Sequence, residues 1–269
     1  MTTHGKGVHE YWLIYDDSQP VNDHLVVFLH GYGASNPGCY GGWIQSITKK
    51  GNTVLFPKFQ IGTFLPRTKA FQRRTEHVIA DAKKLLKKSL HVDVKSLIMV
   101  GHSIGGVIAA NITNDHERNG FSVSGMILCQ PGFKYLKLGG YDTYHHITDA
   151  THLLIITGEN DHAAGRKFAD KVYTTSNIRS NKTWLEHQAY QTDDIKLTAH
   201  HKDPVSPFKE LDSKNVNLVI GGAYLFCQTD LVDELAFWNP SVQFIQNINH
   251  GNLHLATPMN LPVWVAVIN

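Results

Sequence analysis

The sequence has few cysteines and almost no net charge. Its 269 residues include three cysteines, Cys39, Cys129 and Cys227, and an odd, sparse set of this kind does not form a disulfide framework. The formal net charge is +2 when the 17 histidines are counted as neutral. This balance gives no electrostatic reason to expect binding to nucleic acid or to an anionic membrane surface.

Long apolar runs, internal repeats and Pro/Ser-rich linkers are also missing. No stretch approaches the ~18 consecutive apolar residues of a membrane span, and the first residues, Met1–Gly7, contain no apolar signal core. We therefore expect no membrane span and a location in the cytoplasm, although a chain whose leader had been removed would look the same. Because no linker divides the chain, we predict a single domain over residues 1–269.

What the sequence does contain is an alternation of short apolar runs and longer helical patterns. Residues 11–15 predict a strand, antiparallel at the edge of a sheet. The alternation predicts an α/β fold with a mostly parallel, doubly wound central sheet flanked by helices. Five continuous runs are typical of strands buried on both faces of such a sheet: Leu25–Leu29, Thr53–Phe56, Leu97–Val100, Gly125–Leu128 and Leu153–Ile156.

Helices are predicted between and after these strands. Residues Phe168–Tyr173 lie in one of them, and Leu231–Trp238 predicts another. Val216–Ile220 is compatible with a short strand or a helix start, and we expect the segment after Ser206 to pack on the same sheet. A further helix has apolar side chains on one face, at Phe71, Val78, Ala82, Leu85 and Leu86.

A sharp turn follows the run that ends at Val100. Its sequence is Gly101-His102-Ser103-Ile104-Gly105-Gly106, and residues 107–112 then have helical composition. This is the G-x-S-x-G pattern between a strand and a helix, where side chains at Gly101 or Gly105 would collide with neighbouring backbone. A plain glycine-rich turn is one alternative. A phosphate-binding loop is another, but it would need the Gly-Lys-Ser/Thr that is missing here. We predict that Ser103 is a nucleophile, with His102 as a supporting residue.

A second glycine-containing loop, His30-Gly31-Tyr32-Gly33, follows the strand Leu25–Leu29. In enzymes with a G-x-S-x-G nucleophile, this loop supplies one N–H of the oxyanion hole, and the residue after the serine supplies the other. We therefore expect the backbone N–H groups of Tyr32 and Ile104 to stabilise the oxyanion, by ~3–4 kcal/mol each. His30 could be catalytic, but we expect it to hydrogen-bond the loop and hold its shape.

A polar turn at the end of the run Leu153–Ile156 carries two carboxylates, Glu159 and Asp161. The acid of a catalytic triad belongs at the carboxyl end of a later strand, in the chain order Ser, Asp, His. We predict Asp161 as the acid and keep Glu159 in reserve. The simpler alternative is that Asp161 caps a helix that starts at Ala163.

Several histidines follow Asp161. His200 and His201 come after the run Ile195–Ala199 and before Asp203-Pro204, so they lie where a strand end enters a loop. Neighbours there face opposite ways, so only one of the pair can face the carboxyl edge of the sheet. The other would point away, into the packing beneath the loop. Four other histidines are too close to the acid or lack a suitable strand end: His162, His187, His250 and His254.

Four segments together resemble the α/β-hydrolase superfamily: His30–Gly33, Gly101–Gly106, Gly158–Asp161 and Ala199–Pro204. The resemblance spans about residues 10–205. Within this superfamily they resemble the dienelactone-hydrolase, chlorophyllase and polyester-hydrolase (cutinase-like) esterases. The resemblance implies an α/β-hydrolase fold and a Ser-His-Asp triad. In that group the catalytic histidine is commonly followed by any residue, then by a small or acidic residue, and then by Pro. This pattern selects His201 over His200. Gly31-Tyr32 resembles the oxyanion tyrosine of polyester hydrolases, whose ring also flanks the substrate.

The leading hypothesis is the hydrolysis of a small-molecule carboxylic ester through an acyl-enzyme, without a cofactor. A peptidase, thioesterase or lyase on the same scaffold is an alternative, and so is a catalytically silent binding protein, which would usually lack a triad member. We expect no metal site despite the 17 histidines. The pairs His145-His146 and His200-His201 do not share a helical face, and no H-E-x-x-H occurs. The sequence leaves the oligomeric state open.

Overall fold

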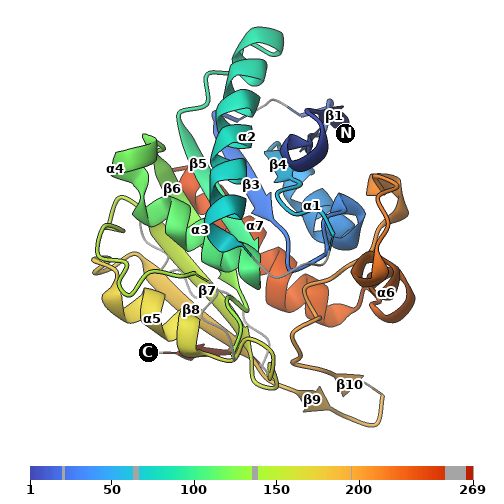
Figure 1. Cartoon of the computed structure of the whole chain (residues 1–269). Helices are drawn as coiled ribbons and strands as arrows, with labels where there is room; N and C mark the ends of the chain where they lie inside the picture. The colour runs from blue at the N-terminus through green and yellow to red at the C-terminus, as the bar shows by residue number, and fades with distance from the viewer. Residues whose placement is uncertain (20–21, 63–66, 135–138, 195, 252–264, 269) are drawn as a thin grey trace.

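The computed structural model describes residues 1–19, 22–62, 67–134, 139–194, 196–251 and 265–268 (Figure 1). The strands are β1 (Thr2–His4), β2 (Tyr11–Ile14), β3 (His24–Leu29), β4 (Thr53–Pro57), β5 (Ser96–His102), β6 (Val123–Cys129), β7 (His152–Gly158), β8 (Lys182–His187), β9 (Tyr190–Gln191), β10 (Lys196–Leu197) and β11 (Val265–Ile268). The α-helices are α1 (Gly41–Thr48), α2 (Thr68–Ser89), α3 (Ile104–Asn114), α4 (His116–Asn119), α5 (Lys167–Thr175), α6 (Leu218–Phe226) and α7 (Asn239–Asn249). Shorter helical turns are η1 (Gly7–His9), η2 (Pro37–Tyr40), η3 (Lys209–Leu211) and the π-helical turn η4 (Asp233–Trp238).

Among the described residues, nine strands form one sheet in the order β1-β2-β4-β3-β5-β6-β7-β8-β11. The strands from β4 to β8 in this order are parallel, while β1, β2 and β11 pair antiparallel at the two sides. The predicted parallel strands and the helices between them are therefore confirmed. Because the six central strands are parallel, their carboxyl ends meet at one edge of the sheet.

Strand β3 shows how the sheet divides the core into two layers. Its side chains alternate between the faces. Leu25, Val27 and Leu29 pack in a cluster with α2, α3 and α5. Val26 and Phe28 pack on the other face with α1, η4 and α7. Because both faces are covered (Figure 1), the strand is apolar along its length, as the continuous run in the sequence indicates.

The prediction that residues 11–15 form an edge strand is wrong in one respect. β2 is antiparallel to β4, as expected, but β1 pairs with its other side and is itself the edge. All four residues of β2 are buried, so its outer hydrogen-bonding groups need a partner. The chain supplies one in Thr2–His4, a short polar strand with no apolar pattern in the sequence.

Between Ser206 and Gly251 the elements after β10 are helical, and the strand β11 then adds to the main sheet beside β8. Val216–Ile220 contains the start of α6, where the side chain of Asn217 accepts a hydrogen bond from the N–H of Ile220 (2.9 Å). The predicted helix Leu231–Trp238 is present and continues into α7. Side chains of α7 lie so close to Gly125 of β6 that a Cβ there would be 2.4 Å from Ile248.

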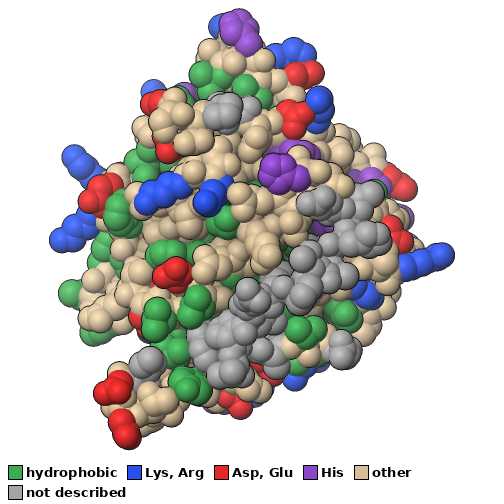
Figure 2. Space-filling model, turned by 180° about the vertical axis from the view of Figure 1, so that it is seen from behind, with side chains coloured by type: hydrophobic (Ala, Val, Ile, Leu, Met, Phe, Trp, Pro, Cys, Tyr) green, Lys and Arg blue, Asp and Glu red, His purple; other side chains and the backbone are tan. Residues whose placement is uncertain are grey.

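The surface carries side chains of both charges. On the face shown in Figure 2, Lys and Arg side chains are interspersed with Asp and Glu. The four most exposed large apolar side chains among the described residues lie in or just before α6, at Val216, Leu218, Leu225 and Phe226. No helix in the described part of the chain is both long and apolar enough to cross a membrane.

The turn between β5 and α3 has a strained backbone. Ser103 has φ 55° and ψ −121°, a region that non-glycine residues rarely occupy. The turn is closed by very near contacts. A Cβ on Gly105 would lie 2.1 Å from the carbonyl oxygen of Leu29, and a Cβ on Gly101 would lie 2.5 Å from that of Gly105. The glycines therefore allow α3 to start directly against β3.

We expect Gly105→Ala to lower the free energy of unfolding by about 3 kcal/mol or more, because backbone atoms must move to admit the methyl group. Gly221→Ala is the matched control, since a Cβ at this helical glycine meets no atom within 4 Å. That change should be neutral or stabilise the protein by up to ~1 kcal/mol. Urea denaturation measures both effects, and equal stabilities of the two variants would contradict the prediction.

Candidate active site

The carboxyl edge of the sheet brings Ser103, His201 and Asp161 together. Ser103 follows β5, Asp161 follows β7, and His201 lies in the loop after β10. His201 Nδ1 is 2.9 Å from Asp161 Oδ2, and His201 Nε2 is 2.9 Å from Ser103 Oγ. A carboxylate only accepts hydrogen bonds, so Nδ1–H donates to Asp161 and the serine hydroxyl donates to Nε2. This is the relative arrangement of a nucleophile, a base and an acid that orients the base.

Asp161 uses both of its carboxylate oxygens. While Oδ2 faces His201, Oδ1 accepts hydrogen bonds from the N–H groups of Ala163 (3.0 Å) and Ala164 (2.9 Å). The alternative that Asp161 caps a helix starting at Ala163 is wrong, since α5 starts at Lys167; Asp161 closes a turn before it and contacts His201 as well. Burial by itself would raise the pKa of Asp161. The hydrogen bond from His201 and those from the two amides outweigh it, and the pKa lies below its ordinary value. Asp161 is thus a carboxylate in the folded protein.

We predicted that the loop with His201 continues from a strand end at the carboxyl edge of the sheet. In the structure, the strand before this loop does not belong to the main sheet. β10 is two residues long and pairs only with β9 among the described residues, and Ile195 lies outside the described residues. A turn shapes the loop instead. The carboxylate of Asp203 accepts hydrogen bonds from the N–H of His200 (2.7 Å) and the hydroxyl of Thr198 (3.0 Å). The loop is therefore held by side-chain contacts and not by a strand ladder.

Two buried side chains attach this loop to the sheet. Gln130, which follows β6, donates a hydrogen bond from Nε2 to the carbonyl oxygen of His200 (3.0 Å). The Nε2 atom of His102, at the end of β5, lies 3.0 Å from the carbonyl oxygen of His201. Gln130 was not among the residues predicted from the sequence. A polar residue directly after a buried parallel strand was the available signal for it.

The other candidates lie elsewhere. Glu159 is exposed and accepts a hydrogen bond from the N–H of Ala189 (3.0 Å). His200 is exposed, with its Nδ1 3.4 Å from the carbonyl oxygen of Asn160, so its predicted place beneath the loop is wrong. His187 is fully buried, with its ring 5.1 Å from that of Phe237. His162 and His250 are exposed, and His254 lies outside the described residues.

The predicted oxyanion loop is held on both sides of Tyr32. The N–H of Gly31 donates to the hydroxyl of Tyr40 (2.8 Å), and the N–H of Gly33 donates to Gln60 Oε1 (2.9 Å). Ile104 is the first residue of α3, so its N–H belongs to the set that has no acceptor within the helix. Tyr32 lies between these two contacts and Ile104 begins α3; that their N–H groups are the oxyanion donors stays a prediction.

His30 is buried beneath this loop. Its Nδ1 lies 2.7 Å from the carbonyl oxygen of Gly31, and its ring stacks on Phe59 with centroids 4.0 Å apart. Burial lowers the pKa of His30 to about 4, so the imidazole is neutral. Its contacts are those of a residue that shapes the loop, as expected from the sequence.

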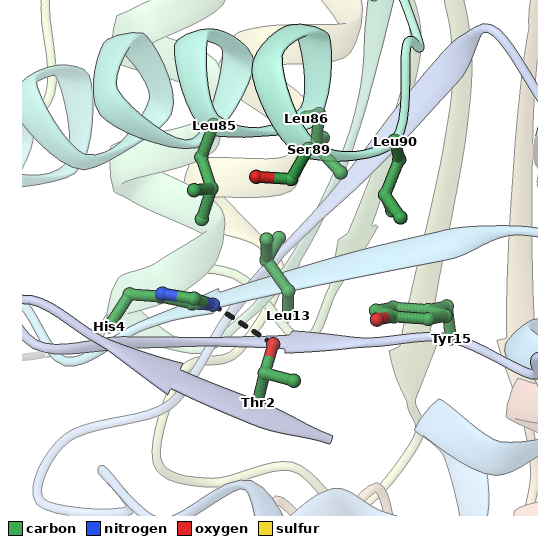
Figure 3. A pocket seen from close by; sticks show the side chains of 8 residues that line it. All are labelled: Thr2, His4, Leu13, Tyr15, Leu85, Leu86, Ser89 and Leu90. Atoms are coloured by element: carbon green, nitrogen blue, oxygen red, sulfur yellow. Dashed lines mark hydrogen bonds between the residues drawn. The ribbon is translucent and has the colours of Figure 1, made fainter.

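In the described part of the chain, no group of three or more His, Cys, Asp or Glu side chains could hold a metal ion. The three cysteines are free thiols. A small apolar pocket lies between β1, β2 and the end of α2, lined by Leu13, Leu85, Leu86 and Leu90 among others (Figure 3). Because α2 ends shortly before β5 begins, this pocket lies at the amino edge of the parallel strands and not at the edge that carries Ser103.

A family model described as "Serine aminopeptidase, S33" matches residues 20–144, which include β3, the loop after it and Ser103. The central sheet with its flanking helices is the architecture of the same superfamily. The chain has the α/β-hydrolase fold. The matched part of the chain ends before Asp161 and His201, so their proposed roles are supported by geometry alone. A search of curated proteins found no match for the chain.

We expect the free energy of unfolding of this protein to fall between pH 7 and pH 5. Burial is the main cause that lowers the pKa of His30 to about 4, of His102 to about 3 and of His187 to about 4. In the unfolded chain these imidazoles bind protons near pH ~6.5. The unfolded state therefore takes up protons at pH values where the folded state does not. Stability is complete above ~6.5 and falls by ~1.4 kcal/mol per pH unit for each imidazole as the pH approaches 4.

Urea denaturation at pH 7, 6 and 5 measures this slope. The change His187→Asn removes one of the three imidazoles and should reduce the slope by ~1.4 kcal/mol per pH unit. A wild-type stability that did not change between pH 7 and pH 5 would contradict the prediction.

Proposed function

We propose that this α/β-hydrolase is a serine hydrolase that cleaves a carboxylic ester through an acyl-enzyme intermediate. The observation that carries the proposal is the position of the His201 imidazole, with one nitrogen 2.9 Å from Ser103 Oγ and the other 2.9 Å from Asp161 Oδ2. Ser103 and Asp161 are 6% and 5% exposed and the His201 side chain is 21% exposed, so the contacts are partly shielded from water. A hydroxyl and an imidazole in this relation can transfer a proton.

In the proposed reaction, Ser103 Oγ attacks the ester carbonyl carbon while His201 Nε2 takes the hydroxyl proton. The carbonyl oxygen becomes an oxyanion, for which the N–H groups of Tyr32 and Ile104 are the proposed donors. Asp161 stabilises the imidazolium and keeps its orientation. The C–O bond to the alcohol then breaks, and His201 gives the proton to the leaving alcohol. Water then attacks the acyl-enzyme while His201 takes a proton from it. The bond to Ser103 Oγ breaks, His201 returns the proton to Ser103, and the acid leaves.

An ester substrate is proposed from the resemblance of the site segments to dienelactone hydrolases, chlorophyllases and polyester hydrolases. A peptidase is the second candidate, because the matching family model is described as a serine aminopeptidase. A panel of p-nitrophenyl esters of increasing acyl length, measured beside aminoacyl p-nitroanilides and thioesters, distinguishes the two. Faster turnover of the anilides would favour the peptidase.

We expect Ser103→Ala to lower kcat for the preferred ester by ~10⁴–10⁶-fold while the protein stays folded, since it removes the nucleophile. A fluorophosphonate probe should label wild-type Ser103 and leave the variant unlabelled. Activity within tenfold of wild type would overturn the assignment. A folded wild type that is never labelled would favour a catalytically silent protein.

We expect Asp161→Asn to lower activity by ~10⁴-fold, because Asn cannot stabilise the same imidazole tautomer or its charged form. Glu159→Gln is the matched control on the same turn, and its activity should stay close to that of wild type.

Likewise His201→Ala should abolish activity, while its neighbour His200→Ala should retain most of it. Steady-state kinetics with one ester measures all four variants. The reverse ranking within a pair would show that the acid or the base is assigned to the wrong residue.

A further inference from the structure

A row of buried hydrogen bonds connects the oxyanion loop to the loop that carries His201. The N–H of Gly31 donates to the hydroxyl of Tyr40 (2.8 Å), and the same hydroxyl lies 2.8 Å from His102 Nδ1. The other nitrogen of that ring, His102 Nε2, lies 3.0 Å from the carbonyl oxygen of His201. Two loops on either side of Ser103, 170 residues apart in the sequence, are thus joined through two side chains.

The partners of these atoms allow only one assignment of the protons. The carbonyl oxygen of His201 can only accept, so His102 Nε2 carries a hydrogen and donates it. Burial, followed by the proximity of His201, lowers the pKa of His102 to about 3, so the ring is neutral and its Nδ1 is an acceptor. The hydroxyl of Tyr40 already accepts from Gly31, and its own hydrogen is directed to Nδ1. Every donor in the row therefore faces an acceptor.

The row has little freedom to rearrange. Tyr40 is fully buried and His102 is 4% exposed. Tyr40 packs on Phe28 of β3 with ring centroids 5.1 Å apart. A Cβ on Gly31 would lie 2.9 Å from His102 Nδ1 and 3.0 Å from the hydroxyl oxygen of Tyr40, so the absence of a side chain lets the loop approach both. Burial raises the pKa of Tyr40, so the phenol keeps its proton.

The His201 loop depends on such contacts because no strand of the main sheet leads into it. The imidazole of His201 must reach Ser103 and Asp161 at the same time, and its ring centroid lies 4.9 Å from that of His102. A shift of its backbone would change both distances. The hydrogen bond from His102 acts on the backbone carbonyl of this same residue.

We propose that Tyr40 and His102 are positioning residues that set the oxyanion loop and the base His201 in a fixed relation to each other. This inference rests on the proposed function of Ser103 and His201. Without the Tyr40 hydroxyl, His102 Nδ1 loses its donor and the Gly31 N–H loses its acceptor, while the His201 carbonyl oxygen still keeps the hydrogen on Nε2. The ring is then held on one side alone, and the oxyanion loop and the His201 loop are free to move relative to each other. Because both residues are buried, we expect the loss to fall on kcat and on the reactivity of Ser103, not on KM.

The first test is Tyr40→Phe, with Tyr144→Phe as the matched control. Tyr144 is equally buried, accepts from the N–H of Tyr141 and donates to Asn111, but it packs in the core on the other face of the sheet. We expect Tyr40→Phe to slow fluorophosphonate labelling of Ser103 and lower kcat by about 10- to 100-fold, with KM within threefold of wild type. Tyr144→Phe should lose stability but label at the wild-type rate. Equal labelling rates for both variants would overturn the inference.

The second test replaces His102. His102→Gln places an amide N–H near the position of Nε2 and should recover most of the activity that His102→Phe loses. If both residues act through the one connection, Tyr40→Phe combined with His102→Phe should cost no more than the larger single effect. Additive losses, or equal activities of the Gln and Phe variants, would show that the two residues do not act together.

Nitrogen NMR of histidine-labelled protein tests the connection without any turnover. His102 should be in the Nε2–H tautomer and should not titrate between pH 5 and pH 9 in wild type, and Tyr40→Phe should keep this tautomer but shift the Nδ1 resonance to that of a nitrogen without a hydrogen-bond donor. A wild-type His102 in the Nδ1–H form would overturn the inference even if Ser103 is labelled. Conversely, a wild type that shows the expected tautomer but neither reacts with the probe nor hydrolyses any ester or anilide would show that the proposed function has failed.

Discussion

The close approach of α3 to β3 sets the geometry of the whole site. Ser103 has a backbone conformation that is unfavourable for a residue with a side chain, and the surrounding contacts must hold it there. Gly105 provides these contacts by packing its backbone against the carbonyl of Leu29. The same contact directs the amino end of α3 toward the loop after β3. A strained serine and the neighbouring N–H groups are thus consequences of one packing constraint.

Around this turn, buried polar groups hold the backbone in place, as strand pairing does elsewhere in the molecule. The strands of the main sheet are held by regular ladders and apolar packing on both faces. The loop of His201 has only a two-residue strand before it, and it is held by Gln130, His102 and the turn at Asp203. Hydrogen bonds of this kind are directional, so they fix an orientation that apolar contacts would leave loose. Precise placement of an imidazole needs this property.

Burial also determines the charges near Ser103. His30 and His102 are neutral because water cannot reach them, while Asp161 keeps its charge because three hydrogen bonds compensate its burial. A second imidazolium beside His201 would oppose the charge that His201 gains during the proposed reaction. The neutral rings can instead serve as hydrogen-bond donors of fixed direction. The cost is a protein whose stability depends on pH where histidine titrates.

The parallel sheet, the turn at Ser103 and the carboxylate at Asp161 could be predicted from the sequence, because each is encoded by neighbouring residues: apolar runs, glycine spacing and a polar turn after a strand. The sequence could not separate His200 from His201 without a family resemblance, and it placed the loop on a longer strand than exists. It also gave no sign that Thr2–His4 forms the edge or that Tyr40 contacts His102. Those features depend on which distant segments the packed sheet brings into contact, and a hydrogen bond between residues 62 positions apart leaves no local pattern. Only the tertiary structure decided them.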